Sequence, residues 1–368
     1  MRLGTDALKY PGGASMTPIE IVESAAGEGL AGVFYRTMLT MSPTLDPGYL
    51  REVRAHVDEH GMYLESGLGK VNPYGLPETP EVRALGDGDT VLGFRRMMEA
   101  AAQIGISELW VSTANIKTYS GRFAYDRFRT DVTWSDQLVA IEKFLRLLSP
   151  IARDNGIHMN LETHEEITSF ELVRLVEAVG PDTVGITFDT ANVVQRAEHP
   201  TLSARRVAPY VRQMHLKDTA LFTGDDGILY QMRPNGEGVV DLDAILPLLY
   251  EAHPDLHLSL ELKQENDVLP VGANPSPRRL EVSLYDPEWL AGHPDLNVTE
   301  LVAYLGLVRQ YEKRAREEGL PSYDEYANTP FDYAAAVDYL RTSVANVRAA
   351  AARAGIVLDG VPAAAPVS

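Results

Sequence analysis

The chain has 368 residues, of which 45% are hydrophobic and 23% charged, as is typical of a globular protein with a substantial core. Its formal charge of −19 argues against general nucleic-acid binding, which depends on lysine and arginine neutralising phosphates. The absence of cysteine excludes disulfides and thiolate ligands, and neither a membrane-length apolar run nor a signal-peptide pattern occurs. We expect a cytoplasmic protein that acts on a small molecule, without nucleic-acid or membrane partners.

Short apolar segments alternate with amphipathic stretches along most of the chain. Their composition, mostly apolar or β-branched, predicts strands that are buried on both faces of a parallel sheet. Eight such segments lie near residues 3, 32, 63, 108, 158, 185, 212 and 257.

Helical patterns fill the intervals between these segments, and several carry end signals. Thr17 is a typical N-cap, followed by Pro18 at the first helical position. A second helix is expected from Asp46 to Gly61, and a third is expected to begin with Ser135 as its cap. Further helices are predicted over 168–180 and 241–253.

Eight successive strand–helix units predict a (β/α)8 TIM barrel with long loops at its C-terminal rim and extra C-terminal helices. An open doubly wound sheet is the alternative, but "DALKYPGGAS" is a poor version of the glycine-rich turn that it requires. We expect one domain over 1–358, with a disordered tail over 359–368. The long loops are expected at about 68–90, 113–133, 218–240 and 264–298.

Potential metal ligands stand at the ends of four consecutive predicted strands: Glu162, Asp189, His215 and Glu261. In a closed barrel these ends meet at one rim, and three carboxylates with an imidazole suit Mn²⁺ best, with Mg²⁺, Co²⁺ and Zn²⁺ as alternatives. Each residue also has a structural explanation. Asp189 could cap the following helix, and His215 could be a hydrogen-bonded core histidine. The repetition over four strands favours a metal site.

The segments "LETHEEITS", "GITFDTANV", "QMHLKD" and "LSLELK" resemble, in that order, the xylose isomerase-like TIM barrels, a superfamily of sugar isomerases and epimerases. The resemblance covers roughly residues 1–265 and implies that the four strand-end residues bind a divalent ion, often Mn²⁺. The family's fifth strand often reads Glu-Asn-His-Gly, so Thr163 and Glu165 are departures from its pattern.

The resemblance implies removal of a proton beside a sugar carbonyl. In the family's epimerases two metal-bound glutamates exchange this proton, and Glu162 and Glu261 match their positions. His164 is the alternative base, and Glu-x-His at this strand is similar to the large subunits of bacterial C-glycoside deglycosidases. Those enzymes cleave 3-oxo-glucosyl compounds and work with a small β-sandwich partner subunit. We expect such cleavage, with ketose isomerisation or epimerisation as the alternative, and an oligomeric protein.

Other side chains are expected to bind the substrate. Lys217 and Arg233 could contact substrate oxygens or stabilise an oxyanion. An aromatic-lined mouth would suit a flavonoid-sized group. The candidates for this lining are Tyr35, Tyr119, Phe123, Tyr230 and Met232.

Two further hypotheses stay open. Apurinic endonucleases have a similar barrel, but they carry histidines on the second and third strands. At those strand ends this chain has Tyr35, Arg36 and Glu65 instead. The other hypothesis is a non-catalytic barrel whose metal only stabilises the fold, since fold alone does not establish activity.

Overall fold

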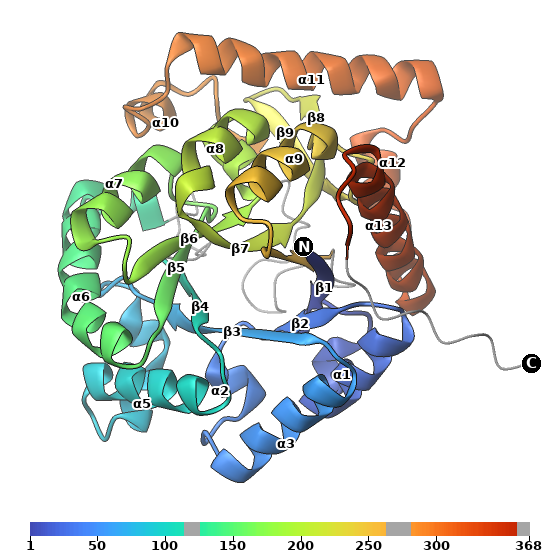
Figure 1. Cartoon of the computed structure of the whole chain (residues 1–368). Helices are drawn as coiled ribbons and strands as arrows, with labels where there is room; N and C mark the ends of the chain where they lie inside the picture. Colours follow the sequence, from blue (N-terminus) through green and yellow to red (C-terminus); the bar gives the residue numbers. More distant parts are fainter. Residues whose placement is uncertain (114–125, 263–280, 359–368) are drawn as a thin grey trace, which may run out of the picture.

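The computed structural model describes residues 1–113, 126–262 and 281–358, and in this part of the chain eight parallel strands form a closed barrel (Figure 1). β1 pairs in parallel with both β2 and β10, which closes the sheet and confirms the TIM barrel over the doubly wound alternative. The barrel strands are β1 (Arg2–Asp6), β2 (Gly32–Phe34), β3 (Tyr63–Lys70), β4 (Glu108–Ser112), β5 (His158–Glu162), β6 (Val184–Asp189), β7 (Val211–Leu216) and β10 (His257–Leu260).

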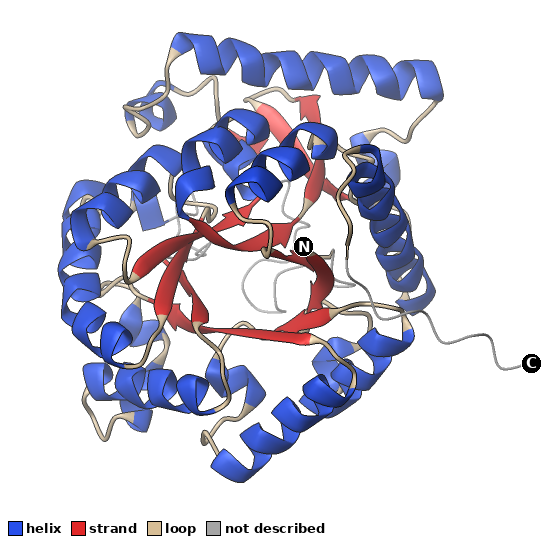
Figure 2. Ribbon diagram, in the orientation of Figure 1, coloured by secondary structure: helices blue, strands red, loops and turns tan. Residues whose placement is uncertain are grey.

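Helices surround the barrel, and Figure 2 shows them as an outer ring around the strands. The ring helices are α1 (Pro18–Gly27), α3 (Pro47–Glu59), α5 (Thr90–Gln103), α6 (Trp134–Asp154), α7 (Ser169–Val179), α8 (Pro200–Val207), α9 (Leu242–Ala252) and α13 (Tyr333–Arg353). The remaining helices are α2 (Met38–Met41), α4 (Pro80–Leu85), α10 (Pro287–Ala291), α11 (Val298–Glu318) and α12 (Tyr323–Ala327). Across the described part of the chain, no helix combines the length and apolarity needed to cross a membrane.

Helix starts follow the predicted capping chemistry with one exception. Thr17 forms a capping box with Glu20 at the start of α1, and the Asp46 side chain accepts a hydrogen bond from Tyr49 N at the start of α3. The predicted cap Ser135 is wrong, because Thr133 caps α6 by accepting from the backbone N–H of Asp136. Either hydroxyl residue fits the local sequence pattern, so backbone geometry decided between them.

The barrel interior holds polar groups that form hydrogen bonds with one another. The Asn160 side chain donates to Gln213 Oε1 at 3.2 Å, and the Tyr63 hydroxyl lies 2.8 Å from Ser259 Oγ. Gly4 and Gly32 make room for the Tyr63 ring, because a Cβ at either position would lie within 2.4 Å of a Tyr63 atom. Hydrophobic packing is therefore concentrated between the barrel and its helices.

The connection at 218–240 contains a hairpin of β8 (Asp218–Thr223) and β9 (Ile228–Arg233), which forms a three-stranded sheet with β11 (Glu281–Val282). This small sheet lies outside the barrel beside α11 (Figure 1). The connection at 68–90 contains α4. Parts of the other two expected loops, 114–125 and 263–280, and the expected disordered tail at 359–368 lie outside the described residues.

Candidate metal centre

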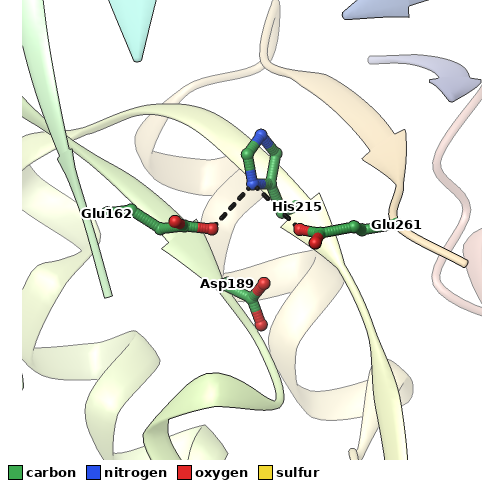
Figure 3. Close-up of side chains that lie close together, drawn as sticks. All are labelled: Glu162, Asp189, His215 and Glu261. Carbon is green, nitrogen blue, oxygen red and sulfur yellow. Dashed lines mark hydrogen bonds and ion pairs between the residues drawn. The ribbon is translucent and has the colours of Figure 1, made fainter. Parts of the chain in front are cut away.

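Four side chains from neighbouring strands meet at the C-terminal end of the barrel. Glu162 ends β5, Asp189 ends β6, His215 is the last but one residue of β7, and Glu261 follows β10. One potential ligand atom from each residue lies within 4.8 Å of all the others, and all four residues are buried. Figure 3 shows the side chains pointing toward a common point. The structure thus brings together the complete set of predicted metal ligands.

Local hydrogen bonds fix the tips of β5 and β6. The Thr163 hydroxyl donates to Asp189 O at 3.0 Å and accepts from Asp189 N at 2.7 Å. Asp189 Oδ1 accepts from Ala191 N and Asn192 N, as expected of a capping aspartate. Its other oxygen, Oδ2, faces the cluster, where it lies 2.9 Å from Lys217 Nζ. One oxygen of Asp189 therefore caps the following turn, and the other faces the cluster.

His215 lies between two of the carboxylates (Figure 3). Its Nδ1 is 2.9 Å from Glu162 Oε1 and 3.4 Å from Glu261 Oε2, and its ring packs against Phe34. Burial disfavours the charged imidazole, but the hydrogen bonds to the two glutamates outweigh burial and raise the pKa of His215 to about 10. Without an ion, a proton on His215 would supply positive charge at the point where the ligands meet, and a bound cation would take its place.

The donor set fits a divalent cation. Three buried carboxylates in one cluster repel one another unless positive charge lies among them. Glu261 Oε2 is buried and lies 3.4 Å from His215 Nδ1, so both donor atoms face the point where an ion would lie. Oxygen and imidazole nitrogen donors in this ratio suit Mn²⁺, Mg²⁺, Co²⁺ or Zn²⁺.

Basic side chains gather on the Glu261 side of the cluster. Lys217 Nζ lies 2.9 Å from both Asp189 Oδ2 and Glu261 Oε1, and Arg36 Nη2 is 3.4 Å from Glu261 Oε1. Lys9 forms an ion pair with the same Glu261 oxygen. Lys217 was predicted to be near the site. Lys9 and Arg36 were not predicted to be site residues. They belong to the first two strand–helix units, far in sequence from the predicted ligands.

Asp6 organises this side from the end of β1. Its Oδ1 accepts hydrogen bonds from Leu8 N and Lys9 N, at 2.8 and 3.1 Å, and its Oδ2 lies 3.7 Å from Arg36 Nη2. Asp6 therefore sets the position of Lys9 through the backbone. A signal for Asp6 was present in the sequence, since it ends an apolar strand as Asp189 does.

His164 lies on the opposite side, beside Glu162. Its Nε2 is 3.7 Å from Glu162 Oε2, and its Nδ1 is 2.5 Å from Glu166 Oε2. Glu166 also accepts a hydrogen bond from the Thr113 hydroxyl, so the carboxylate that holds His164 is itself fixed. Burial opposes protonation of His164, but the charge and hydrogen bond of Glu166 raise its pKa to about 10. Glu166 was not predicted, because the neighbouring acid Glu165 has the same side chain.

The other predicted substrate contacts have different surroundings. Tyr35 points away from the cluster, because its hydroxyl donates to Pro18 O and its ring is in the hydrophobic core. Arg233 stacks on Tyr326 of α12, 3.5 Å from the ring centre, so we do not place it in the site.

Tyr230 is buried on β9, and its charge interaction with Lys217 places it near that lysine. Its hydroxyl donates to the sulfur of Met232, which is half-buried at the edge of the core. Of the predicted aromatic lining, Tyr119 and Phe123 lie outside the described residues.

Comparison with known proteins places the chain in a family of TIM barrels. The profile of the family described as "Xylose isomerase-like TIM barrel" matches residues 22–290. The chain is 25% identical to the uncharacterized protein YihM of Escherichia coli over 202 residues. This alignment covers 54% of this chain and 61% of YihM. The chain is 24% identical to 3-oxo-isoapionate decarboxylase of Pectobacterium atrosepticum over 192 residues. This alignment covers 49% of this chain and 68% of that enzyme.

A solved structure supports the fold assignment. D-psicose 3-epimerase from Clostridium cellulolyticum H10, determined with D-tagatose, superposes with a TM-score of 0.57. The match covers 84% of this chain and 99% of the epimerase at 15% sequence identity, so it supports the fold alone.

Proposed function

This chain belongs to the xylose isomerase-like TIM barrel family, and we propose that it is a divalent-metal-dependent enzyme that removes a proton beside the carbonyl of a sugar-derived substrate. The observation that carries the proposal is the position of His164, held by buried Glu166 on one ring nitrogen and facing the metal-ligand set with the other. A bound divalent cation would oppose protonation of the nearby imidazole, so that His164 could accept a proton from a bound carbonyl compound.

Glu162, Asp189, His215 and Glu261 would hold the ion, which we propose to be Mn²⁺ because carboxylates predominate among the ligands. Such an ion, when bound, polarises the substrate carbonyl and stabilises the negative charge that develops on its oxygen. The protein residues bind and orient the substrate and move the proton.

We propose that the reaction is cleavage of a 3-oxo-C-glucoside. His164 accepts the proton from C2, and the electrons of the broken C–H bond form an enediolate with the C3 carbonyl. When the C3 carbonyl re-forms, a C1–C2 double bond is made and the bond from C1 to the aglycone breaks. The aglycone carbon takes up a proton as it leaves. The similarity to a protein named 3-oxo-isoapionate decarboxylase favours this proposal, because a decarboxylase also breaks a carbon–carbon bond in a 3-oxo compound.

Isomerisation or epimerisation of a ketose is the second candidate. It is supported by the placement of Glu162 and Glu261 on either side of His215 (Figure 3), which would let two carboxylates approach a bound sugar from different sides. The endonuclease alternative has less support, because β2 and β3 carry no histidine and the chain is strongly acidic.

The test is to incubate the Mn²⁺-loaded protein in D₂O with a 3-oxo-C-glucoside and, separately, with a panel of ketoses. Deuterium incorporation beside the carbonyl reports proton removal, and release of the aglycone reports cleavage. We expect both signals from the glucoside and loss of both in His164→Gln. Ketose turnover without aglycone release would move the assignment to the isomerase. If no substrate exchanges deuterium, the remaining hypothesis is a non-catalytic barrel whose metal only stabilises the fold.

We further propose that the reaction takes place in the cytoplasm and that the protein works as an oligomer with a small β-rich subunit. A cysteine-free chain and the resemblance to C-glycoside deglycosidases support these proposals. Co-purification with tagged protein from the source cells tests the partner. Recovery of the barrel chain alone, with full activity, would exclude a required second subunit.

A further inference from the structure

We infer that the substrate carries an anionic oxygen group, a carboxylate or a phenolate, which binds where Lys9, Arg36 and Lys217 converge on Glu261. We call these three residues the basic wall. The inference rests on the proposed function, because it assumes that the substrate binds at the metal centre. The inference adds to the proposed function the charge of the substrate and the orientation of the substrate in the site.

The basic wall is built from three separate parts of the fold. Lys9 comes from the turn after β1, Arg36 follows β2, and Lys217 follows β7. All three side chains contact one oxygen, Glu261 Oε1, with Lys217 Nζ at 2.9 Å and Arg36 Nη2 at 3.4 Å. Convergence from three elements requires the tertiary structure and is not a property of a local charge run.

One carboxylate oxygen cannot saturate the N–H groups of two ammonium groups and a guanidinium. Lys217 has further partners in Asp189 Oδ2 and Asn192 Oδ1, and its side chain is only 8% exposed. Lys9 and Arg36 are 18% and 37% exposed, so both can reach a ligand. Donors on these two residues therefore remain available on the open side of the site.

The site is also polarised. The basic wall lies beside Glu261, whereas His164 and the Glu166 that holds it lie beside Glu162 at the end of β5. A substrate would place its anionic group against the wall and its acidic C–H bond toward His164. A carboxylate on the sugar and an ionised phenol on a leaving aromatic group both meet this requirement, since both present anionic oxygen to N–H donors.

Two matched pairs of probes test the inference on the Mn²⁺-loaded protein by isothermal titration calorimetry. D-glucuronate is compared with D-glucose, and 4-nitrophenolate is compared with 4-nitroanisole, its uncharged methyl ether. We expect the anion of at least one pair to bind about tenfold or more tightly than its neutral counterpart. Lys9→Gln should remove most of that preference. The matched control is Lys143→Gln, at an exposed position of α6, and it should keep the preference.

The pair that responds identifies the source of the anionic group: the glucuronate pair a sugar acid, the nitrophenolate pair an aromatic leaving group. Equal binding within both pairs overturns the inference. Preference that survives in both Lys9→Gln and Arg36→Gln also overturns it, because the ion itself would then be binding the anion. Metal content is measured for each variant, so a loss of manganese is recognised.

His164→Gln separates this inference from the proposed function. It should keep the preference for anions while losing deuterium exchange. If the wild-type protein shows the preference but no exchange on any substrate, the proposed reaction fails and the anion site stands.

Discussion

The two mouths of the barrel both carry glutamate–histidine pairs, but only one brings them to a common point. At the N-terminal mouth Glu65 lies 2.9 Å from His257 Nδ1, and Glu108 lies 3.1 Å from His158 Nδ1. Each of these carboxylates has its own histidine. At the C-terminal mouth His215 is shared by Glu162 and Glu261, and Asp189 completes the cluster.

A cavity does not by itself mark the candidate site. The N-terminal mouth holds a cavity of about 510 Å³ that is lined by Glu65, Glu108 and His257. Its carboxylates are paired separately, with Asn160 and Arg212 also close to Glu108. What distinguishes the C-terminal mouth is an excess of buried acceptors around one point, which a cation relieves.

The largest effect should come from removing one acceptor at each mouth. In Glu261→Gln we expect metal affinity to fall about 100-fold or more, with loss of deuterium exchange, because a ligand of the ion has lost its charge. Glu65→Gln at the other mouth should retain metal and activity. Metal content after dialysis and the exchange rate measure both. Equal losses in the two variants would remove the distinction between the mouths.

A histidine pair gives the next test. His164→Gln should lower the rate of proton removal by a factor of about 10² to 10⁴ with metal still bound, as expected on loss of a general base. His257→Gln, the N-terminal counterpart, should leave the rate unchanged. Rate constants at saturating Mn²⁺ are compared with bound manganese. A His164→Gln variant with full activity would assign the base to a glutamate instead.

Metal removal should lower the stability of the chain only where the ligands at the C-terminal mouth are intact. With Mn²⁺ at 100 times its Kd, the ion stabilises the folded chain by about 2.7 kcal/mol. For a chain of this length that corresponds to a Tm shift of about 3 °C. Chelation should lower Tm by this amount in the wild type and in Glu65→Gln, but not in Glu261→Gln. A metal-dependent Tm in Glu261→Gln would contradict the ligand assignment.

The smallest effect is expected for Tyr63→Phe. It removes the hydroxyl that bonds Ser259 Oγ inside the barrel, and we expect about 1 kcal/mol lower stability with unchanged metal affinity. Urea unfolding and a manganese titration measure the two quantities. A large drop in metal affinity would mean that the polar interior couples the two mouths.

The sequence by itself determined the barrel and the cluster of side chains at its strand ends. Apolar runs repeated with helical stretches between them, and parallel strands of a closed barrel place their ends on one rim, so Glu162, Asp189, His215 and Glu261 could be predicted together. N-caps such as Thr17 were also predictable, because their chemistry involves only the next few residues.

Only the tertiary structure decided which other side chains join that site. Phe34 packs against His215, so its neighbour Tyr35 points to the opposite side of the strand and into the core. Lys9 and Arg36 reach Glu261 across more than two hundred residues of sequence. Glu166, and not Glu165, holds His164. Such contacts depend on side-chain direction and on barrel closure, which local sequence patterns do not specify.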